Sequence, residues 1–240
     1  MINISVSPSK VENFRKFYDE ELKGIVTEEA VVQSIMGTTP WKPAMIFGSA
    51  FHKILEVDAS QFYNPKTGLY VVQDDQMPEP ITMVQSEVDV ANKYRESYPH
   101  MIHEIKCHYR TLIGKYDVRV NMRIDGMSGI VVHEKKTTSK SPEVGNYERS
   151  VQWKFYALAT ECRVIQYDIF QIKEYKSGPR EITHIPFQFF PYAEMKGDVD
   201  RWIMHLIRFA EDRNLLDYLI PKWDNEDLFP VSNETIFGTT

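Results

Sequence analysis

The stretch Met122-Arg-Ile-Asp-Gly-Met-Ser-Gly-Ile-Val-Val-His-Glu-Lys-Lys-Thr137 contains the features that decide the fold of this chain. Apolar residues stand on both sides of Gly126-Met-Ser-Gly129, which predicts two β-strands joined by a short turn that contains glycine. Because side chains alternate along a strand, Glu134 and Lys136 share one face with the apolar residues before them. Asp125 closes the first strand and could meet Glu134 across the hairpin, depending on the register of the two strands.

Two carboxylates and a lysine in this arrangement suit the hydrolysis of a phosphodiester. A hard divalent cation held by carboxylates neutralises the phosphate and lowers the pKa of a water molecule. A lysine beside the cation can orient the attacking water or stabilise developing negative charge. On a half-buried strand these groups cost stability unless they are paired or bound to a metal. The alternative is a surface hairpin with a solvated Glu–Lys pair, because the D…ExK pattern is short and common.

Four short motifs surround this hairpin in chain order. They are Gly48-Ser-Ala-Phe-His52, Asp125, Glu134-Lys135-Lys136 and Gln152-Trp-Lys-Phe-Tyr156. Together they resemble the PD-(D/E)XK nuclease superfamily, on its RecB-type branch, which includes phage exonucleases. The opening segment Ser5–Phe14 also resembles the start of such proteins, so the resemblance covers roughly residues 5 to 175. It implies an α/β fold with a restriction-endonuclease-like core, in which helices flank a central mixed β-sheet.

Carried over residue by residue, the resemblance implies a catalytic and metal-binding set. Asp125 and Glu134 would bind a divalent metal ion together with the main-chain carbonyl of Lys135. His52 would be a further ligand, which suits Mn²⁺ somewhat better than Mg²⁺ because imidazole is a softer ligand than carboxylate. Lys136 would be the catalytic lysine. Glu134 stands where many relatives carry aspartate, and its longer side chain should still reach a metal.

Three residues are predicted to contact the substrate. Gln152 and Tyr156 are four residues apart and share a helix face, and the resemblance implies that they steady the substrate backbone or the lysine. Lys140, in the loop over residues 137–142, could contact phosphates. Each motif also has a simpler interpretation: such a Gln–Tyr pair is common on amphipathic helices, and a lone helical histidine such as His52 is often a core residue.

Other residues are weaker candidates. Trp41 and Tyr63 lie in segments rich in proline and glycine and could stack on bases. Glu104 and Asp117, on the preceding strands, could each be an extra acidic ligand or a solvated surface residue. His133 and Lys135 lie on the strand face opposite Glu134, so we do not expect their side chains to take part in catalysis.

Composition sets the bounds on the class of protein. The 240 residues suit a single nuclease domain over 1–240, with 221–240 as a loosely held tail. No run of about 18 apolar residues occurs, which predicts no membrane span, and the start of the chain does not resemble a signal peptide. Two cysteines, Cys107 and Cys162, indicate a reducing compartment such as the cytoplasm. They cannot supply the four ligands of the iron–sulfur cluster that some RecB-type relatives hold, so we expect none.

The net charge of −6 argues mildly against a nucleic-acid partner. Residues 114–154, however, carry eight lysines and arginines against five carboxylates, so the region of the proposed site is basic. A basic region in an acidic protein fits an enzyme that grips DNA in a groove, and it also fits an ordinary surface.

The sequence therefore predicts a DNA nuclease dependent on Mg²⁺ or Mn²⁺. The resemblance implies an exonuclease that acts on DNA ends in recombination or repair, and it makes a homo-oligomer and a recombination partner protein further expectations. The alternatives are an endonuclease or flap-type nuclease, a nuclease-derived DNA-binding scaffold without turnover, and a hydrolase of another phosphoester.

The expected order of elements is helices, a meander, a helix, two strands and a long helix. Helices are predicted over residues 8–23, 44–56, 84–97, 147–160 and 192–219, strands over 103–112, 116–125, 130–137, 163–175 and 181–190, and an irregular excursion over 58–80.

Overall fold

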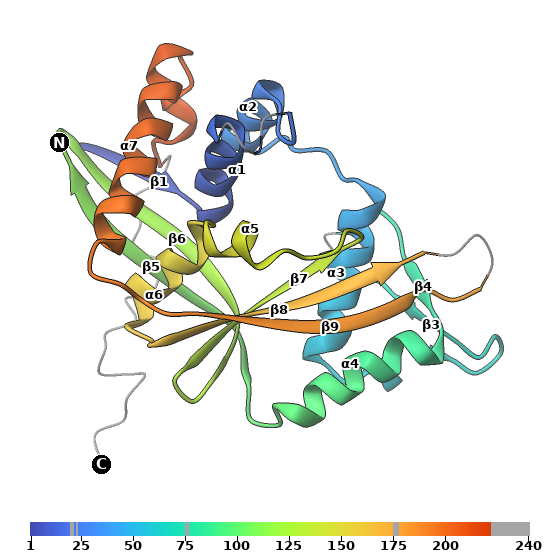
Figure 1. The fold of residues 1–240 in the computed structure, drawn as a ribbon. Helices are drawn as coiled ribbons and strands as arrows, with labels where there is room; N and C mark the ends of the chain where they lie inside the picture. The colour runs from blue at the N-terminus through green and yellow to red at the C-terminus, as the bar shows by residue number, and fades with distance from the viewer. Residues whose placement is uncertain (20–21, 23, 75–76, 175–177, 222–240) are drawn as a thin grey trace.

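The computed structural model describes residues 1–19, 22, 24–74, 77–174 and 178–221. A six-stranded mixed sheet lies at its centre, with helices on both faces (Figure 1). The strands of this sheet are β1 (Ile2–Val6), β5 (Ile102–Ile113), β6 (Tyr116–Ser128), β7 (Val131–Thr138), β8 (Val164–Lys173) and β9 (Glu181–Phe189). The helices are α1 (Pro8–Tyr18), α2 (Glu28–Met36), α3 (Pro43–Glu56), α4 (Gln85–Ser97), α5 (Val144–Glu148), α6 (Gln152–Thr160) and α7 (Met195–Asp212).

Strand β6 organises the sheet, because it pairs with three other strands. Its first half runs parallel to β1, its last residues pair antiparallel with β7, and β5 lies antiparallel along its other edge. Beyond β7 the sheet continues with β8, which is parallel to β7, and β9, which is antiparallel to β8. This confirms the predicted α/β class with a central mixed sheet flanked by helices, and it is consistent with a restriction-endonuclease-like core.

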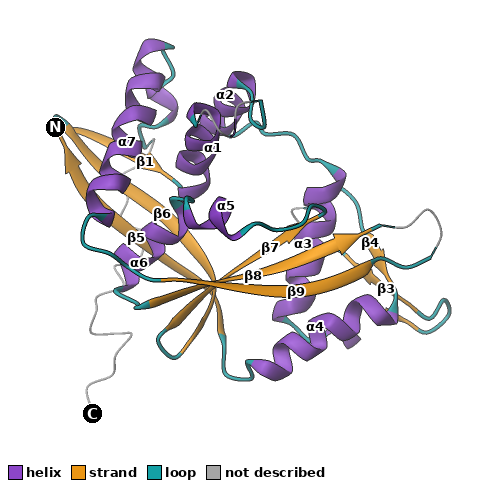
Figure 2. Ribbon diagram, in the orientation of Figure 1, coloured by secondary structure: helices purple, strands orange, loops and turns teal. Residues whose placement is uncertain are grey.

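Two apolar clusters cover the two faces of the sheet, between it and the helices drawn in Figure 2. Helices α1, α6 and α7 pack on one face, where β8 contributes Tyr167 and Ile169. Helices α3 and α4 pack on the other, where β8 contributes Phe170 and Ile172. Because both faces are covered, polar side chains on either face of the central strands are buried and must find partners.

The hairpin turn is shorter than predicted. Strand β6 continues to Ser128, and the turn consists of Gly129, with φ of +57°, and Ile130. A glycine at positive φ suits such a tight turn. Ile130 is one of the apolar residues predicted to share a strand face with Glu134. It lies in the turn and is 62% exposed, so the prediction was wrong for this residue.

Several element boundaries also differ from the predictions. The first helix ends at Tyr18, the predicted helix over 147–160 is divided into α5 and α6, and the last long helix ends at Asp212 before a short 3₁₀ turn. The excursion over 58–80 holds a 3₁₀ turn (Ala59–Phe62) and most of a small sheet of β2 (Tyr63–Asn64), β3 (Leu69–Val72) and β4 (Ile81–Met83). Of the predicted tail, residues 222–240 lie outside the described residues. Within the described part of the chain, none of the helices has the length and apolar character needed to cross a bilayer.

Candidate active site

The candidate site lies where β6 and β7 separate. Their pairing ends at Gly126 opposite His133, and the same register would set Asp125 opposite Glu134. In place of a further ladder bond, Oδ2 of Asp125 accepts a hydrogen bond of 2.8 Å from the main-chain N–H of Lys135. The register therefore brings together the two carboxylates that the sequence could place only near one another.

Glu134 is the centre of a network that contains four of the predicted site residues. Its Oε1 lies 2.5 Å from Nζ of Lys136 and accepts a hydrogen bond of 2.7 Å from the amide of Gln152. The Gln152 amide also donates to the hydroxyl of Tyr156 at 2.7 Å. Gln152 and Tyr156 share a helix face, as predicted, and they support the Glu134 carboxylate rather than contact the lysine.

The second oxygen of this carboxylate is unusual. Glu134 is only 2% exposed, and its buried Oε2 has no hydrogen-bond partner among the described residues. Burial, together with the nearby charge of Asp125, raises the pKa of Glu134 to about 7. A buried carboxylate oxygen without a partner costs free energy, and a cation bound there would remove that cost. The donor set at this position therefore fits a hard divalent ion.

His52 lies on α3 and lines, with Asp125, a cavity of about 260 Å³. Burial lowers the pKa of His52 to about 4, although the charge of Asp125 opposes the shift. The imidazole is therefore neutral at neutral pH, the form that binds metals. In the ranges that the structure describes, no three His, Cys, Asp or Glu side chains are grouped closely enough to hold a metal ion. His52 and Glu134 each feel the charge of Asp125, but the three do not form a closed ligand set.

Helix α3 approaches the end of β7 closely at Gly48. A Cβ atom at this position would lie 2.7 Å from Oγ1 of Thr137, a separation that real side chains do not tolerate. The glycine of the first motif therefore has a packing function, since it lets the helix that carries His52 lie against the strand that carries Glu134.

We expect Gly48→Ala to destabilise the protein by about 1–3 kcal/mol, the usual cost of overpacking. In an unhindered helix the same change stabilises by up to about 1 kcal/mol. Urea unfolding measures the difference. Gly197→Ala in α7, where nothing lies within 4 Å of the added atom, is the matched control and should be neutral or stabilising. Combining Gly48→Ala with Thr137→Ala should restore the lost stability, because the second change removes the Oγ1 atom that the added methyl group would meet. A Gly48→Ala protein as stable as the wild type would contradict the packing role.

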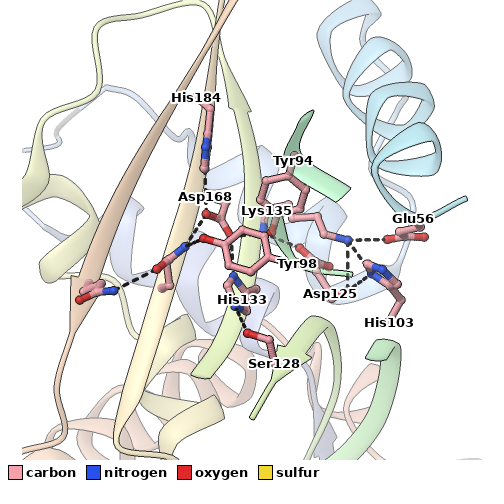
Figure 3. Close-up of polar contacts among 12 residues, drawn as sticks. Glu56, Tyr94, Tyr98, His103, Asp125, Ser128, His133, Lys135, Asp168 and His184 are labelled. Carbon is pink, nitrogen blue, oxygen red and sulfur yellow. Dashed lines mark hydrogen bonds and ion pairs between the residues drawn. The ribbon is translucent and has the colours of Figure 1, made fainter. Parts of the chain in front are cut away.

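The side chain of Lys135 points to the other face of the sheet, as predicted, and is fully buried. Its Nζ lies 3.2 Å from each of three atoms: Oε1 of Glu56, Nδ1 of His103 and the main-chain oxygen of Asp125 (Figure 3). It therefore ties α3, β5 and β6 together beside the cavity that His52, Glu56 and Asp125 line. The role of its main-chain carbonyl as a metal ligand stays a prediction.

Lys136, Lys140 and Gln152 line a second cavity of about 480 Å³. Hydroxyl and amide side chains of α1, of the end of β7 and of the residues that follow it form part of its wall: Ser9, Asn13, Thr137, Thr138, Ser141 and Asn146. The carboxylates of Glu12 and Glu143 also line it. The structure thus brings Lys140 into one cavity with Lys136, while His52 and Asp125 line the other. Contact of Lys140 with phosphate stays a prediction.

Two further acidic residues line the cavity of His52 and Asp125: Glu56, which was not predicted, and Glu104, which was a weaker candidate. Glu56 follows His52 by one helical turn, and this spacing is the signal that could have found it. Glu104 lines the same cavity as His52, with a backbone φ of +58° that interrupts the pairing of β5 opposite Asp125. Its carboxylate is 36% exposed and pairs with the exposed Arg123 at 2.7 Å, which is compatible with the surface role.

The comparisons with known proteins give distant matches of structure alone. No protein-family model and no curated protein matches this sequence. The crystal structure of SSO0001 is similar with a TM-score of 0.47 and 13% identity, covering 87% of this chain and 77% of that one. The alkaline exonuclease LHK-Exo from Laribacter hongkongensis gives a TM-score of 0.41 and 12% identity, covering 88% and 91%. The structure of LHK-Exo in complex with dAMP gives a TM-score of 0.37 and 13% identity, covering 87% of this chain and 91% of that one. Any function must therefore follow from the residues of the site itself.

Proposed function

We propose that this protein is a divalent-metal-dependent DNA nuclease that acts as an exonuclease on DNA ends. The observation that supports the nuclease most directly is the buried carboxylate of Glu134, which contacts Lys136 and keeps one oxygen without a described partner. A solvated surface Glu–Lys pair would be exposed, whereas Glu134 is buried. The step from nuclease to exonuclease rests on the family resemblance of the motifs.

The proposed metal ligands are Asp125 and Glu134, with His52 and the main-chain carbonyl of Lys135 completing the set. A bound Mg²⁺ or Mn²⁺ would neutralise the scissile phosphate and lower the pKa of the attacking water. His52 and Glu134 each lie close enough to Asp125 to feel its charge, which supports assigning the three side chains to one ion.

The chain's own groups would then act on the phosphate and the water. Lys136 holds a positive charge beside Glu134, where it can orient the water or stabilise negative charge that develops on the phosphate. Gln152 and Tyr156 keep the Glu134 carboxylate in its orientation. Lys140 would bind a neighbouring phosphate from the cavity that it shares with Lys136.

A second candidate function is a DNA-binding scaffold without turnover. It is favoured by the fact that, across the described residues, no group of three metal-ligating side chains is assembled. The contact between Glu134 and Lys136 and the unpartnered carboxylate oxygen favour the enzyme instead.

The test of the function is cleavage of end-labelled linear DNA and of a covalently closed circle, in Mg²⁺ and in Mn²⁺. We expect the linear DNA to be degraded and the circle to be spared. Cutting of the circle would identify an endonuclease. Binding of DNA and metal without cleavage of either substrate would favour the scaffold.

We expect Mn²⁺ to raise the melting temperature, and Asp125→Asn to abolish this rise. At a hundredfold excess over the dissociation constant a ligand stabilises by about 2.7 kcal/mol, which corresponds to roughly 5–10 °C for a chain of this size. Differential scanning fluorimetry measures the shift. Asp117→Asn is the matched control, because Asp117 lies on the same strand but pairs with Arg110, and it should keep the shift. An undiminished shift in Asp125→Asn would refute the metal assignment.

A further inference from the structure

We propose that Trp41 is a stacking platform for one unpaired nucleobase, held beside the proposed metal site. This inference rests on the proposed nuclease function and gives it a substrate class, namely a single-stranded or frayed DNA end. Trp41 lines the cavity of about 260 Å³ that His52 and Asp125 also line. A base stacked on this ring would therefore lie next to the residues that are proposed to act on the adjoining phosphate.

The backbone fixes Trp41 relative to the site. It stands between Pro40 and Pro43, and Pro43 is the first residue of α3, the helix that carries His52. Two prolines this close restrict the backbone of the segment. The indole is therefore attached to the same helix as the proposed metal ligand, through only one intervening residue.

The ring of Trp41 is free to accept a partner. Trp41 is 43% exposed, and none of the described aromatic side chains stacks on it. The other two described tryptophans are packed. Trp153 stacks on Phe189 with ring centroids 5.5 Å apart, and Trp202 lies in an edge contact with Phe14 at 6.4 Å. An exposed, unpartnered indole inside a cavity is the less common arrangement, because burying so large a ring is strongly favourable.

The charges of the cavity favour a base over a phosphate. Its wall carries four carboxylates and two basic side chains, and each basic group is in an ion pair: Lys53 with Asp74 at 3.5 Å and Arg123 with Glu104 at 2.7 Å. Phosphate would find little attraction there apart from a bound metal ion, whereas the cavity beside Lys136 is lined by three lysines, Lys16, Lys136 and Lys140, against two carboxylates. The two cavities therefore suit different parts of a nucleotide, the base in one and the backbone in the other.

The size of the cavity limits the ligand to a single base. Its volume of about 260 Å³ is below the range of about 300–1,000 Å³ that is usual for drug-sized ligands, and a duplex could not enter it. Stacking tolerates every base, since each has a π-face. The site should therefore take an unpaired end without selecting its sequence.

The direct test is tryptophan fluorescence during titration with a ten-nucleotide oligothymidylate and with a blunt ten-base-pair duplex. The measurement uses the full chain with Lys136→Ala, in Mn²⁺, so that cleavage during the titration is slowed at least about a hundredfold. We expect saturable quenching by the oligothymidylate, retained after Trp202→Phe and lost after Trp41→Phe, with much weaker quenching by the duplex. Quenching that survives Trp41→Phe would overturn the proposal.

The second test separates this proposal from the proposed function. With Lys136 intact, we expect Trp41→Ala to raise KM for single-stranded DNA about 5- to 150-fold, the effect of losing one stacked base, with kcat within a factor of two. Trp41→Phe should recover most of the loss. If the wild type cleaves DNA and Trp41→Ala has an unchanged KM, the stacking proposal fails alone. If the wild type cleaves nothing, the proposed function fails, and the fluorescence titration still decides the role of Trp41.

Discussion

In Lys136→Ala, we expect cleavage of linear DNA to fall by a factor of about 10² to 10⁴, the range for a positioned group that stabilises charge or transfers a proton. Burial lowers the pKa of Lys136, but the carboxylates of Glu134 and Asp125 outweigh it, so the pKa lies above its ordinary value. The side chain is therefore a fixed positive charge at the proposed site of reaction. Release of the end label at saturating DNA measures the change in kcat.

Two variants serve as controls for this prediction. Lys140→Ala removes a lysine from the same cavity without touching Glu134, so it should raise KM and leave kcat nearly unchanged. Lys196→Ala, on α7, should change neither. The melting temperature of Lys136→Ala must be compared with the wild type, because Glu134 loses its counter-charge. A folded Lys136→Ala protein with wild-type kcat would remove the lysine from the mechanism.

The second large effect concerns stability and the residue Asp168, which lies on the face of the sheet opposite Glu134. Asp168 is fully buried on β8, and its carboxylate accepts hydrogen bonds from Tyr94 at 2.7 Å, Gln166 at 2.7 Å, and His133 and His184 at 2.8 Å (Figure 3). Asp168→Asn turns one acceptor into a donor that faces other donors. We expect a loss of about 3–5 kcal/mol at pH 7, measured by urea unfolding, which is a large part of the stability of an ordinary domain.

The pH dependence of this loss follows from the pKa of Asp168. Burial would raise that pKa, but the hydrogen bonds from His133, His184 and Tyr94 hold it well below the ordinary value of an aspartate. Because the pKa of Asp168 is lower in the folded state, its charge stabilises the fold at pH values above the unfolded pKa of about 3.9. This stabilisation is lost progressively as the pH falls below that value. The difference in free energy of unfolding between wild type and Asp168→Asn should therefore be largest at pH 7 and should decrease below about pH 4. A gap that stays constant down to pH 3 would mean that the charge of Asp168 does not stabilise the fold.

The parts of the site that sequence predicted are those fixed by local geometry. Alternation along one strand places Glu134 and Lys136 on one face, and helical spacing places Gln152 and Tyr156 together. These pairs meet in the structure as expected. Contacts between distant segments, such as Lys135 with Glu56, could not be predicted, because they depend on how α3 packs on the sheet.

The boundaries that sequence misplaced have tertiary causes. Gly126 resembles a turn residue, but it lies within β6, where a Cβ atom would overlap the side chain of Met101. The break between α5 and α6 coincides with a hydrogen bond of 2.9 Å from the N–H of Val151 to the buried Glu12 of α1. Strand β1 is short, and its pairing partner on β6 lies more than a hundred residues further along the chain. No local pattern carries these contacts.

The length of the turn, only Gly129 and Ile130, determines which residues of β7 face each side of the sheet. Four consecutive polar residues, His133 to Lys136, alternate between the two faces of the sheet: Glu134 and Lys136 join the proposed catalytic network, and His133 and Lys135 join buried polar contacts on the other face. An insertion or deletion of one residue there that shifted β7 by one position would exchange the two sets without altering a single side chain. The length of this loop is therefore under a stricter constraint than its composition, and the protein should tolerate substitutions in it far better than changes of length.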